Sequence, residues 1–94
     1  MRFVWDETKN RVNKAKHGVS FEIARRIFDD PLHVSVPDRR EHGEERWATI
    51  GLVGTVLLLI VIHTYVEQNG EEIIRIISAR KATKVERARY EQDT

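Results

Sequence analysis

Apolar residues in the first third of the chain recur at helical spacing. Phe21, Ala24, Ile27 and Phe28 lie three or four positions apart, which predicts a helix over residues 21–28. Ser20 precedes this run and is a candidate N-cap, and the sequence Asp29-Asp30-Pro31 ends it because proline disfavours helical backbone before it.

The residues before this helix predict a short strand and another helix. Phe3-Val4-Trp5 is a short apolar run, typical of an edge strand. Asp6 is a candidate N-cap, residues 8–17 are rich in Lys, Arg and Asn, and Gly18 is a suitable C-terminal residue. The first third therefore reads as a strand followed by two helices joined by a tight turn.

From residue 32 onward the pattern changes to that of strands. Leu32, Val34 and Val36 alternate with polar residues, and residues 37–45 read as a charged loop. Three further β-rich runs follow, at residues 46–53, 56–66 and 71–79, separated by the candidate turns Gly54-Thr55 and Gln68-Asn69-Gly70. Residues 56–62 are apolar throughout, which predicts a central strand covered on both faces.

A last helix is predicted at the C-terminus. Thr83 and Glu86 have the spacing of a capping box, and the helix extends to about Tyr90. The chain of 94 residues is short enough for one domain, residues 1–94. We therefore expect an α+β fold, with two N-terminal helices packed on an antiparallel sheet of about four strands, plus a C-terminal helix.

Composition excludes several functional classes. The chain has no cysteine, which excludes thiol nucleophiles and disulfides and is compatible with a reducing compartment. The apolar stretch at residues 50–62 is shorter than the ~20 residues of a membrane span, and the N-terminus lacks a signal-peptide pattern. We expect a cytoplasmic protein that does not enter a membrane. A net charge of +1 permits nucleic-acid binding only if the basic groups cluster.

Strand pairing brings candidate chemical groups together. If both the Gly54-Thr55 hairpin and the next hairpin have loops of even length, one sheet face carries four polar residues, namely Arg46, His63, Ser78 and Arg80. Trp47, Thr64 and Arg75 then lie on the other face. A single bulge would reverse this sorting. The expectation is conditional for that reason.

Such a cluster suits phosphate chemistry. Arginine offers charge and two parallel hydrogen bonds to phosphate oxygens, and histidine transfers protons near neutral pH. RNA cleavage through attack of the 2′-hydroxyl on the adjacent phosphorus needs these groups and no metal.

Each candidate also has a structural interpretation. His63 suits a buried structural histidine, and Arg75, between isoleucines, suits an ion-paired group. Ser78 suits a backbone cap, and Arg80 with Lys81 suits a solvated strand end. Lys14 and Lys16 suit an ordinary polar helix face, with His17 favoured by the helix dipole.

Motifs for other chemistries are missing from the sequence. The four histidines are scattered and form no H-E-x-x-H pair, and there is neither a phosphate-binding P-loop nor a G-x-S-x-G elbow. We expect no metal and no cofactor.

Four stretches together resemble the BrnT toxin family. They run from Phe3-Val4-Trp5-Asp6 through Lys16-His17-Gly18-Val19-Ser20-Phe21, over Ala24 to Pro31, from Glu45-Arg46 to His63-Thr64, and from Ile74 through Ile77-Ser78-Ala79-Arg80-Lys81-Ala82-Thr83 to Glu86-Arg87 and Tyr90. The resemblance covers nearly the whole chain in order.

The resemblance implies a function. It implies a RelE-like fold and a metal-independent endoribonuclease that cleaves RNA, including ribosome-associated mRNA, and so inhibits translation. Its implied partner is a BrnA-like ribbon-helix-helix antitoxin. The toxin contacts operator DNA only through this antitoxin. The residues it marks as catalytic are Arg46, His63, Arg75, Ser78 and Arg80. Its secondary candidates are Lys16, His17 and Tyr90. With Lys14 and Lys81, these are the residues that we expect to bind RNA.

One alternative remains open at the level of sequence. The chain is also compatible with a non-catalytic RNA- or partner-binding module that acts as a transcriptional co-repressor with its antitoxin.

Overall fold

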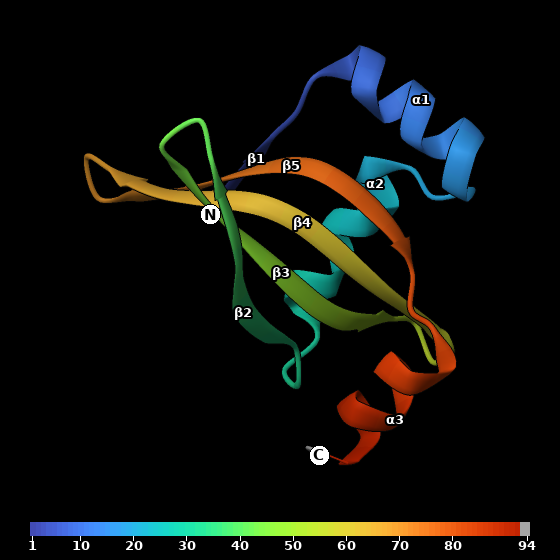
Figure 1. Ribbon diagram of the computed structural model, residues 1–94. Helices are drawn as coiled ribbons and strands as arrows, with labels where there is room; N and C mark the ends of the chain where they lie inside the picture. The colour runs from blue at the N-terminus through green and yellow to red at the C-terminus, as the bar shows by residue number, and fades with distance from the viewer. Residues whose placement is uncertain (93–94) are drawn as a thin grey trace.

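The chain folds into a five-stranded sheet with helices on both of its faces (Figure 1). The computed structural model describes residues 1–92. Its elements are β1 Arg2–Val4, α1 Glu7–His17, α2 Phe21–Ala24, the 3-10 helix η1 Arg25–Asp29, β2 Val34–Glu41, β3 Glu44–Val53, β4 Leu57–Gln68, β5 Glu71–Lys81 and α3 Lys84–Gln92. The α+β class expected from the sequence is confirmed. No helix within these residues is long and apolar enough to cross a membrane.

The N-terminal helices begin and end at the expected residues. The Asp6 carboxylate accepts hydrogen bonds from two N–H groups of the first turn of α1, and Gly18 ends the helix in the left-handed conformation at φ 73°. Ser20 caps α2. The second expected helix is not regular, however, because α2 is a single turn that tightens into η1 at residue 25. The segment therefore buries its apolar residues without forming a long second helix.

Helix α1 is attached to the sheet by amide side chains instead of an apolar stripe. Its buried residues are Asn10 and Asn13. The Asn13 amide donates to the carbonyl of Ala79 at 2.9 Å and accepts from the N–H of Ala79 at 3.1 Å, so it pairs with β5 as another strand would. Asn10 accepts from the N–H of Phe21 at 2.8 Å. Because amides make the contact, the basic side chains of α1 stay outside.

The predicted charged loop at residues 37–45 is wrong. Strand β2 runs to Glu41 and β3 begins at Glu44, so only His42 and Gly43 form the turn. Both have positive φ, 52° and 72°, which is the conformation of a tight two-residue hairpin turn. Such a turn needs left-handed backbone at both positions, and a histidine before glycine is a weak signal for it in sequence.

The sheet is mixed and larger than expected. The strand order is β1-β5-β4-β3-β2. β1 pairs in parallel with β5, whereas the other neighbours are antiparallel. The expectation of about four antiparallel strands omitted this parallel edge strand from the sheet. β2 forms the opposite edge.

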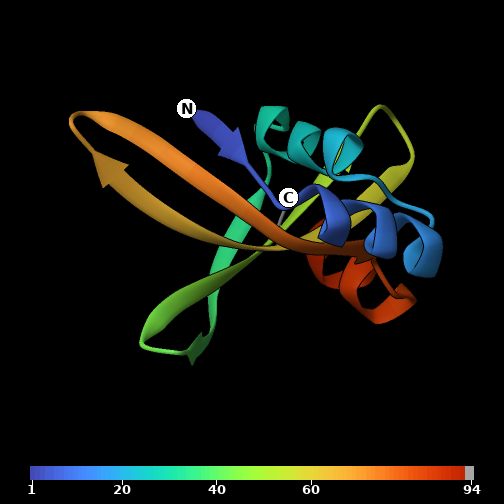
Figure 2. The same ribbon diagram turned by 90° about the horizontal axis from the view of Figure 1, so that it is seen from above.

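The two faces of the sheet differ in their cover (Figure 2). Helices α1, α2 and η1 lie over one face, here called the helix-side face, and α3 lies on the other, the open face. The core lies under α1, α2 and η1. It consists chiefly of Phe21, Ala24, Ile27, Leu59, Val61, Ile74, Ile76 and Ala79. Most of the open face remains uncovered.

Loop length decides which face His63 joins. Val53 pairs with Leu57, so the β3–β4 loop has three residues and not an even number. Trp47 therefore pairs with His63, and both point to the helix-side face, whereas Arg46 points to the open face. The expectation that Arg46 and His63 share a face is wrong for this reason.

A bulge in β5 sorts the remaining residues. Ile62 pairs with Ser78 but His63 pairs with Ile76, which leaves one extra residue in β5 between them. Ser78, Arg80 and Arg75 consequently all point to the open face. The expectation that Arg75 lies apart from Arg46, Ser78 and Arg80 is wrong, since His63 alone is on the opposite side.

His63 is buried within a chain of hydrogen bonds. It is 3% exposed. Its Nδ1 lies 3.0 Å from the carbonyl of Thr64, which can only accept, so Nδ1 carries the hydrogen of the neutral ring. Nε2 then accepts from the Thr49 hydroxyl at 2.7 Å, and that hydroxyl accepts from Ser35 at 2.6 Å. Burial lowers the pKa of His63 below its usual 6.5, against the opposing effect of the Thr64 hydrogen bond.

We expect the free energy of unfolding to decrease as pH falls below about 6.5. The unfolded chain then takes up a proton at His63, whereas the folded chain resists protonation at this site. His63 does not reduce the free energy of unfolding above its pKa in the unfolded chain. Below that pKa, the free energy of unfolding decreases by at most about 1.4 kcal/mol per pH unit. Urea unfolding between pH 5 and 7.5 measures it.

The matched variant is His63→Gln, which removes the titrating group and keeps a polar side chain. Its unfolding free energy is expected to change less over the same interval. Carboxylates with lowered pKa, such as Glu86, lose their contribution only at more acidic pH. Equal pH dependence in the two proteins would show that burial of His63 does not control it.

Gly51 marks the closest approach of η1 to the sheet. A Cβ at this position would lie 2.8 Å from the Cβ of Ile27 and 2.9 Å from its carbonyl oxygen. Gly51→Ala should therefore reduce the free energy of unfolding by about 1–3 kcal/mol, as overpacking does elsewhere. Ala48→Ser, on the other face of β3, should change it by less than about 0.5 kcal/mol. Denaturant unfolding of the two variants tests the contact, and similar values would contradict it.

Candidate active site on the open face of the sheet

The open face carries an apolar floor that ends at charged side chains. Cross-strand pairing places Val34, Ile50, Ile60 and Arg80 in one row, and Val36, Ala48, Ile62 and Ser78 in the next. Arg75 pairs with Thr64 further along the same face. Each row thus begins at the exposed edge strand β2 and ends on β5.

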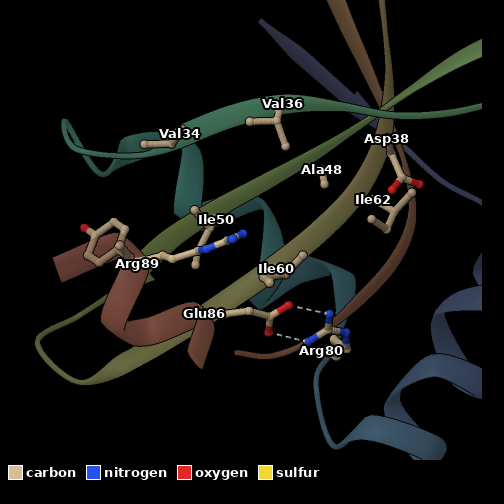
Figure 3. A pocket seen from close by; sticks show the side chains of 11 residues that line it. Val34, Val36, Asp38, Ala48, Ile50, Ile60, Ile62, Arg80, Glu86 and Arg89 are labelled. Carbon is tan, nitrogen blue, oxygen red and sulfur yellow. Dashed lines mark hydrogen bonds and ion pairs between the residues drawn. The ribbon is translucent and has the colours of Figure 1, made fainter. Parts of the chain in front are cut away.

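A groove of about 370 Å³ runs along these rows beneath α3 (Figure 3). Its floor is apolar, and its polar groups are Asp38 from β2, Arg80 from β5, and Glu86, Arg89 and Tyr90 from α3. The three α3 residues follow the helical spacing i, i+3 and i+4, which places them on one side of the helix. Strands β2 to β5 and helix α3 therefore contribute to one concave site, here called the open-face groove.

Arg80 is held by a forked ion pair with Glu86, visible as two dashed lines in Figure 3. Nη1 and Nη2 of the guanidinium donate to the two carboxylate oxygens at 2.8 and 2.9 Å. This pairing lowers the pKa of Glu86 to about 2 and raises that of Arg80. Glu86 therefore stays ionised near neutral pH and is a poor proton carrier.

Glu86 also starts α3. Its carboxylate accepts from the N–H of Thr83 at 2.8 Å, and its own N–H donates to the Thr83 hydroxyl at 3.2 Å. The expected capping box is confirmed. One carboxylate thus fixes the beginning of α3 and the orientation of the Arg80 guanidinium, whose Nε–H makes no hydrogen bond within residues 1–92 and remains available for a ligand.

The other two candidate arginines each contact a glutamate through one guanidinium nitrogen. Arg46 lies 2.6 Å from a Glu41 oxygen and Arg75 lies 2.5 Å from a Glu44 oxygen, both glutamates being at the β2–β3 turn. The Arg46 side chain is only 16% exposed, and its Nε is buried without a hydrogen-bond partner. Neither arginine lines the open-face groove, but both lie further along the same face.

Tyr90 lines the groove with its ring but not with a free hydroxyl. Its hydroxyl donates to the Asp30 carboxylate at 2.5 Å, and the side chain is 8% exposed. Burial and this hydrogen bond raise the pKa of Tyr90 to about 12, so the phenol keeps its proton. Asp30 also accepts from the N–H groups of Leu32 and Leu52. The contact anchors α3 to the sheet.

The remaining RNA-binding candidates separate into two groups. Lys16 and His17 lie at the end of α1 beside Ser78, in a shallow depression of about 280 Å³ that also includes Lys9. Lys14 faces Glu22, whose pKa it helps to lower, although Asn10 contributes most. Lys81 is exposed, and because it pairs with Leu59 its side chain is on the helix-side face of β5. The structure therefore brings Lys16 and His17 to Ser78, but not Lys14 or Lys81.

Three groove residues were not among the sequence candidates. The sequence pattern places Asp38 in a loop and Glu86 at a helix cap, and it marks no role for Arg89. The helical spacing of Glu86, Arg89 and Tyr90 was the available signal for their common location. Residues 1–92 contain no group of three or more His, Asp or Glu side chains arranged to hold a metal ion.

This geometry suits stabilisation of negative charge more than proton transfer by histidine. Guanidinium groups oriented by carboxylates can bind phosphate oxygens in a defined direction. His63, the one histidine among the catalytic candidates, lies on the other face of the sheet.

Comparisons with known proteins agree with this architecture. Residues 5–86 match the family model described as the ribonuclease toxin BrnT of type II toxin–antitoxin systems. The crystal structure of the Brucella abortus ribonuclease toxin BrnT is similar, with a TM-score of 0.61 and 26% sequence identity over 89% of this chain and 99% of that one. A comparison with curated protein sequences found no match. The family model spans most of the chain, and the chain belongs to the BrnT family of ribonuclease toxins of type II toxin–antitoxin systems.

Proposed function

We propose that this chain is an endoribonuclease toxin that cleaves RNA at the open-face groove and thereby inhibits translation. The observation that carries the proposal is the location of Arg80, whose guanidinium is oriented by Glu86 at the end of a concave apolar floor. Family membership supports the reaction class. The site and the activity of this copy are the new elements of the proposal.

In the proposed reaction the RNA 2′-oxygen attacks the adjacent phosphorus and the 5′-oxygen leaves. The free edge of the Arg80 guanidinium binds a phosphate oxygen and stabilises the charge that develops in the transition state. Arg46, Arg75 and Ser78 bind neighbouring phosphates on the same face. The 2′-hydroxyl proton passes to water, because the ion pair with Arg80 lowers the pKa of Glu86 to about 2 and makes it a weak base. The leaving oxygen takes a proton from water, and no metal takes part.

His63 has no role in this mechanism. Its buried position and its hydrogen bonds to Thr49 and Thr64 favour the structural interpretation. Lys16 and His17, beside Ser78, are proposed to guide the RNA past the edge of β5. Tyr90 is proposed to contact RNA through its ring alone, and Lys14 and Lys81 through long-range attraction.

We further propose a RelE-like fold for the single domain 1–94. The order of elements supports it, with helices on one sheet face and the candidate site with its C-terminal helix on the other.

Membership of a type II system implies a cognate antitoxin. We propose a BrnA-like ribbon-helix-helix antitoxin that neutralises the toxin in the cytoplasm and provides the only contact with operator DNA.

The alternative is a non-catalytic binding module that acts as a co-repressor with its antitoxin. One observation favours it: all three candidate arginines are already neutralised by Glu41, Glu44 or Glu86. A groove with an apolar floor and paired charges also suits a protein segment.

Growth and RNA cleavage separate these functions. Expression of the chain alone should arrest growth and degrade RNA, and Arg80→Ala should abolish both. Arg80→Lys should reduce the cleavage rate by about 100-fold or more, since a lysine keeps the charge but loses the fork.

Arg2→Ala is the control, because it removes only an exposed ion pair with Glu71. Thermal unfolding of each variant shows whether α3 remains folded. Normal growth with soluble wild-type protein present would favour the co-repressor.

Salt dependence tests the contribution of α1. Lys16→Gln should reduce the slope of log affinity against log salt by about 0.7 for single-stranded RNA, the value for one phosphate contact. Arg2→Gln should leave the slope unchanged. Fluorescence anisotropy of labelled RNA between 50 and 200 mM salt measures both slopes. An unchanged slope for Lys16→Gln would place the RNA away from α1.

A further inference from the structure

A further cavity lies on the helix-side face, beside η1. It measures about 340 Å³ and is open to solvent. Its wall is unusually rich in rings, which come from Phe28, His33, Trp47, His63 and Tyr65, and Glu72 lies among them. It is here called the aromatic cavity. The proposed cleavage mechanism uses none of these residues.

Strand register builds this cavity. Trp47 pairs with His63 across β3 and β4, and Tyr65 pairs with Ile74 across β4 and β5, all on the helix-side face. The Phe28 ring meets the His63 and His33 rings edge-on at centroid distances of 5.1 and 5.8 Å. The buried ring of His63 lines one part, whereas Tyr65 is 43% exposed. Flat surfaces at such angles suit a planar ligand.

The polar groups of the cavity offer both donors and acceptors. The Tyr65 hydroxyl donates to one Glu72 oxygen at 2.6 Å, which leaves the other oxygen free to accept. His33 Nδ1 bonds the carbonyl of Asp30 at 2.7 Å, so Nε2 of the neutral ring is an acceptor. The indole N–H of Trp47 has no hydrogen-bond partner within residues 1–92. These groups match the edge of a heterocycle.

The same lining disfavours phosphate. No lysine or arginine side chain is among the cavity's lining residues, which include Met1 at the N-terminus, and Glu72 would repel an anion. The cavity therefore differs in kind from the open-face groove. Its chemistry selects a neutral, planar ligand with N–H donors.

We propose that the aromatic cavity binds a purine base of the RNA substrate. The base stacks on Trp47. In other proteins, stacking of bases on aromatic side chains contributes to the binding of single-stranded nucleic acid. Guanine is favoured, because its ring N–H and its amino group are adjacent donors toward the Glu72 carboxylate, in which one oxygen is free and the other can accept from the base as well as from Tyr65. The volume is at the lower end of ligand cavities and suits a single base.

Edge strand β2 connects this cavity with the proposed cleavage site. The inference rests on that proposed function. Val34, Val36 and Asp38 line the open-face groove, whereas His33 and Ser35, adjacent to them, line the aromatic cavity. β2 is the last strand of the sheet, and most of its residues are exposed. An RNA strand that crosses this edge would present phosphate to one face and a base to the other.

Intrinsic fluorescence tests base binding without cleavage. In a Trp5→Phe background, Trp47 is the only tryptophan. Guanosine and guanosine 5′-monophosphate should change its emission saturably and with similar affinity, because the cavity does not bind the phosphate group. Cytidine should bind at least fivefold more weakly, and ribose 5-phosphate should have no effect.

Glu72→Gln should weaken guanosine binding about tenfold, since an amide cannot accept from both donors. The matched control is Glu67→Gln, which removes the same charge from the residue paired with Glu72 but outside the cavity lining. It should bind guanosine as the parent does. Circular dichroism confirms that both variants are folded.

The inference is overturned if guanosine gives no saturable change, if ribose 5-phosphate binds as well, or if the two glutamate variants behave alike. The Arg80→Ala protein makes the two proposals separable. Guanosine binding by Arg80→Ala supports the cavity even where RNA cleavage fails. RNA cleavage by a protein that does not bind guanosine leaves the proposed function intact and refutes the cavity.

Discussion

The single extra residue in β5 is the constraint on which the candidate site depends. Arg75 and Ser78 are three positions apart and would face opposite sides of a regular strand. The bulge at Ile77 turns the strand by one residue, so both face the same side as Arg80. The same bulge leaves Ile76 and Ala79 in the core. One irregularity therefore maintains the core and gathers the cationic groups on the uncovered face.

Carboxylates control the charge of that face. Arg46, Arg75 and Arg80 are each paired with a glutamate, which explains how a chain of net charge +1 can concentrate arginines without a strongly positive surface. The Arg75 and Arg80 pairs are partly exposed and contribute little to stability, so a phosphate can compete for their guanidinium donors at modest cost. At Arg80 the forked pair with Glu86 also fixes the plane of the guanidinium.

The attachment of α1 separates structural from ligand-binding residues on one short helix. Asn10 and Asn13 are buried and satisfy backbone groups of Phe21 and Ala79. Apolar periodicity could not reveal this helix's buried side, since its contacts are amide hydrogen bonds. Lys16 and His17 remain on the surface beside Ser78 as a result. The basic end of α1 therefore lies beside β5, next to Ser78.

The sequence by itself determined the α+β class, the caps of α1, α2 and α3, and most strand positions, because these depend on contacts between residues close in the chain. Strand pairing in the sequence grouped Arg46, His63, Ser78 and Arg80 and set Arg75 apart, whereas the family resemblance named all five. The tertiary structure alone decided the common face of the three arginines and Ser78 and the separation of His63, since a three-residue loop and one bulge reverse the side on which every later residue lies. It also decided that β1 pairs in parallel with β5. Asp38, Glu86 and Arg89 are distant in sequence, and they line one groove only because α3 packs on the sheet beside β2.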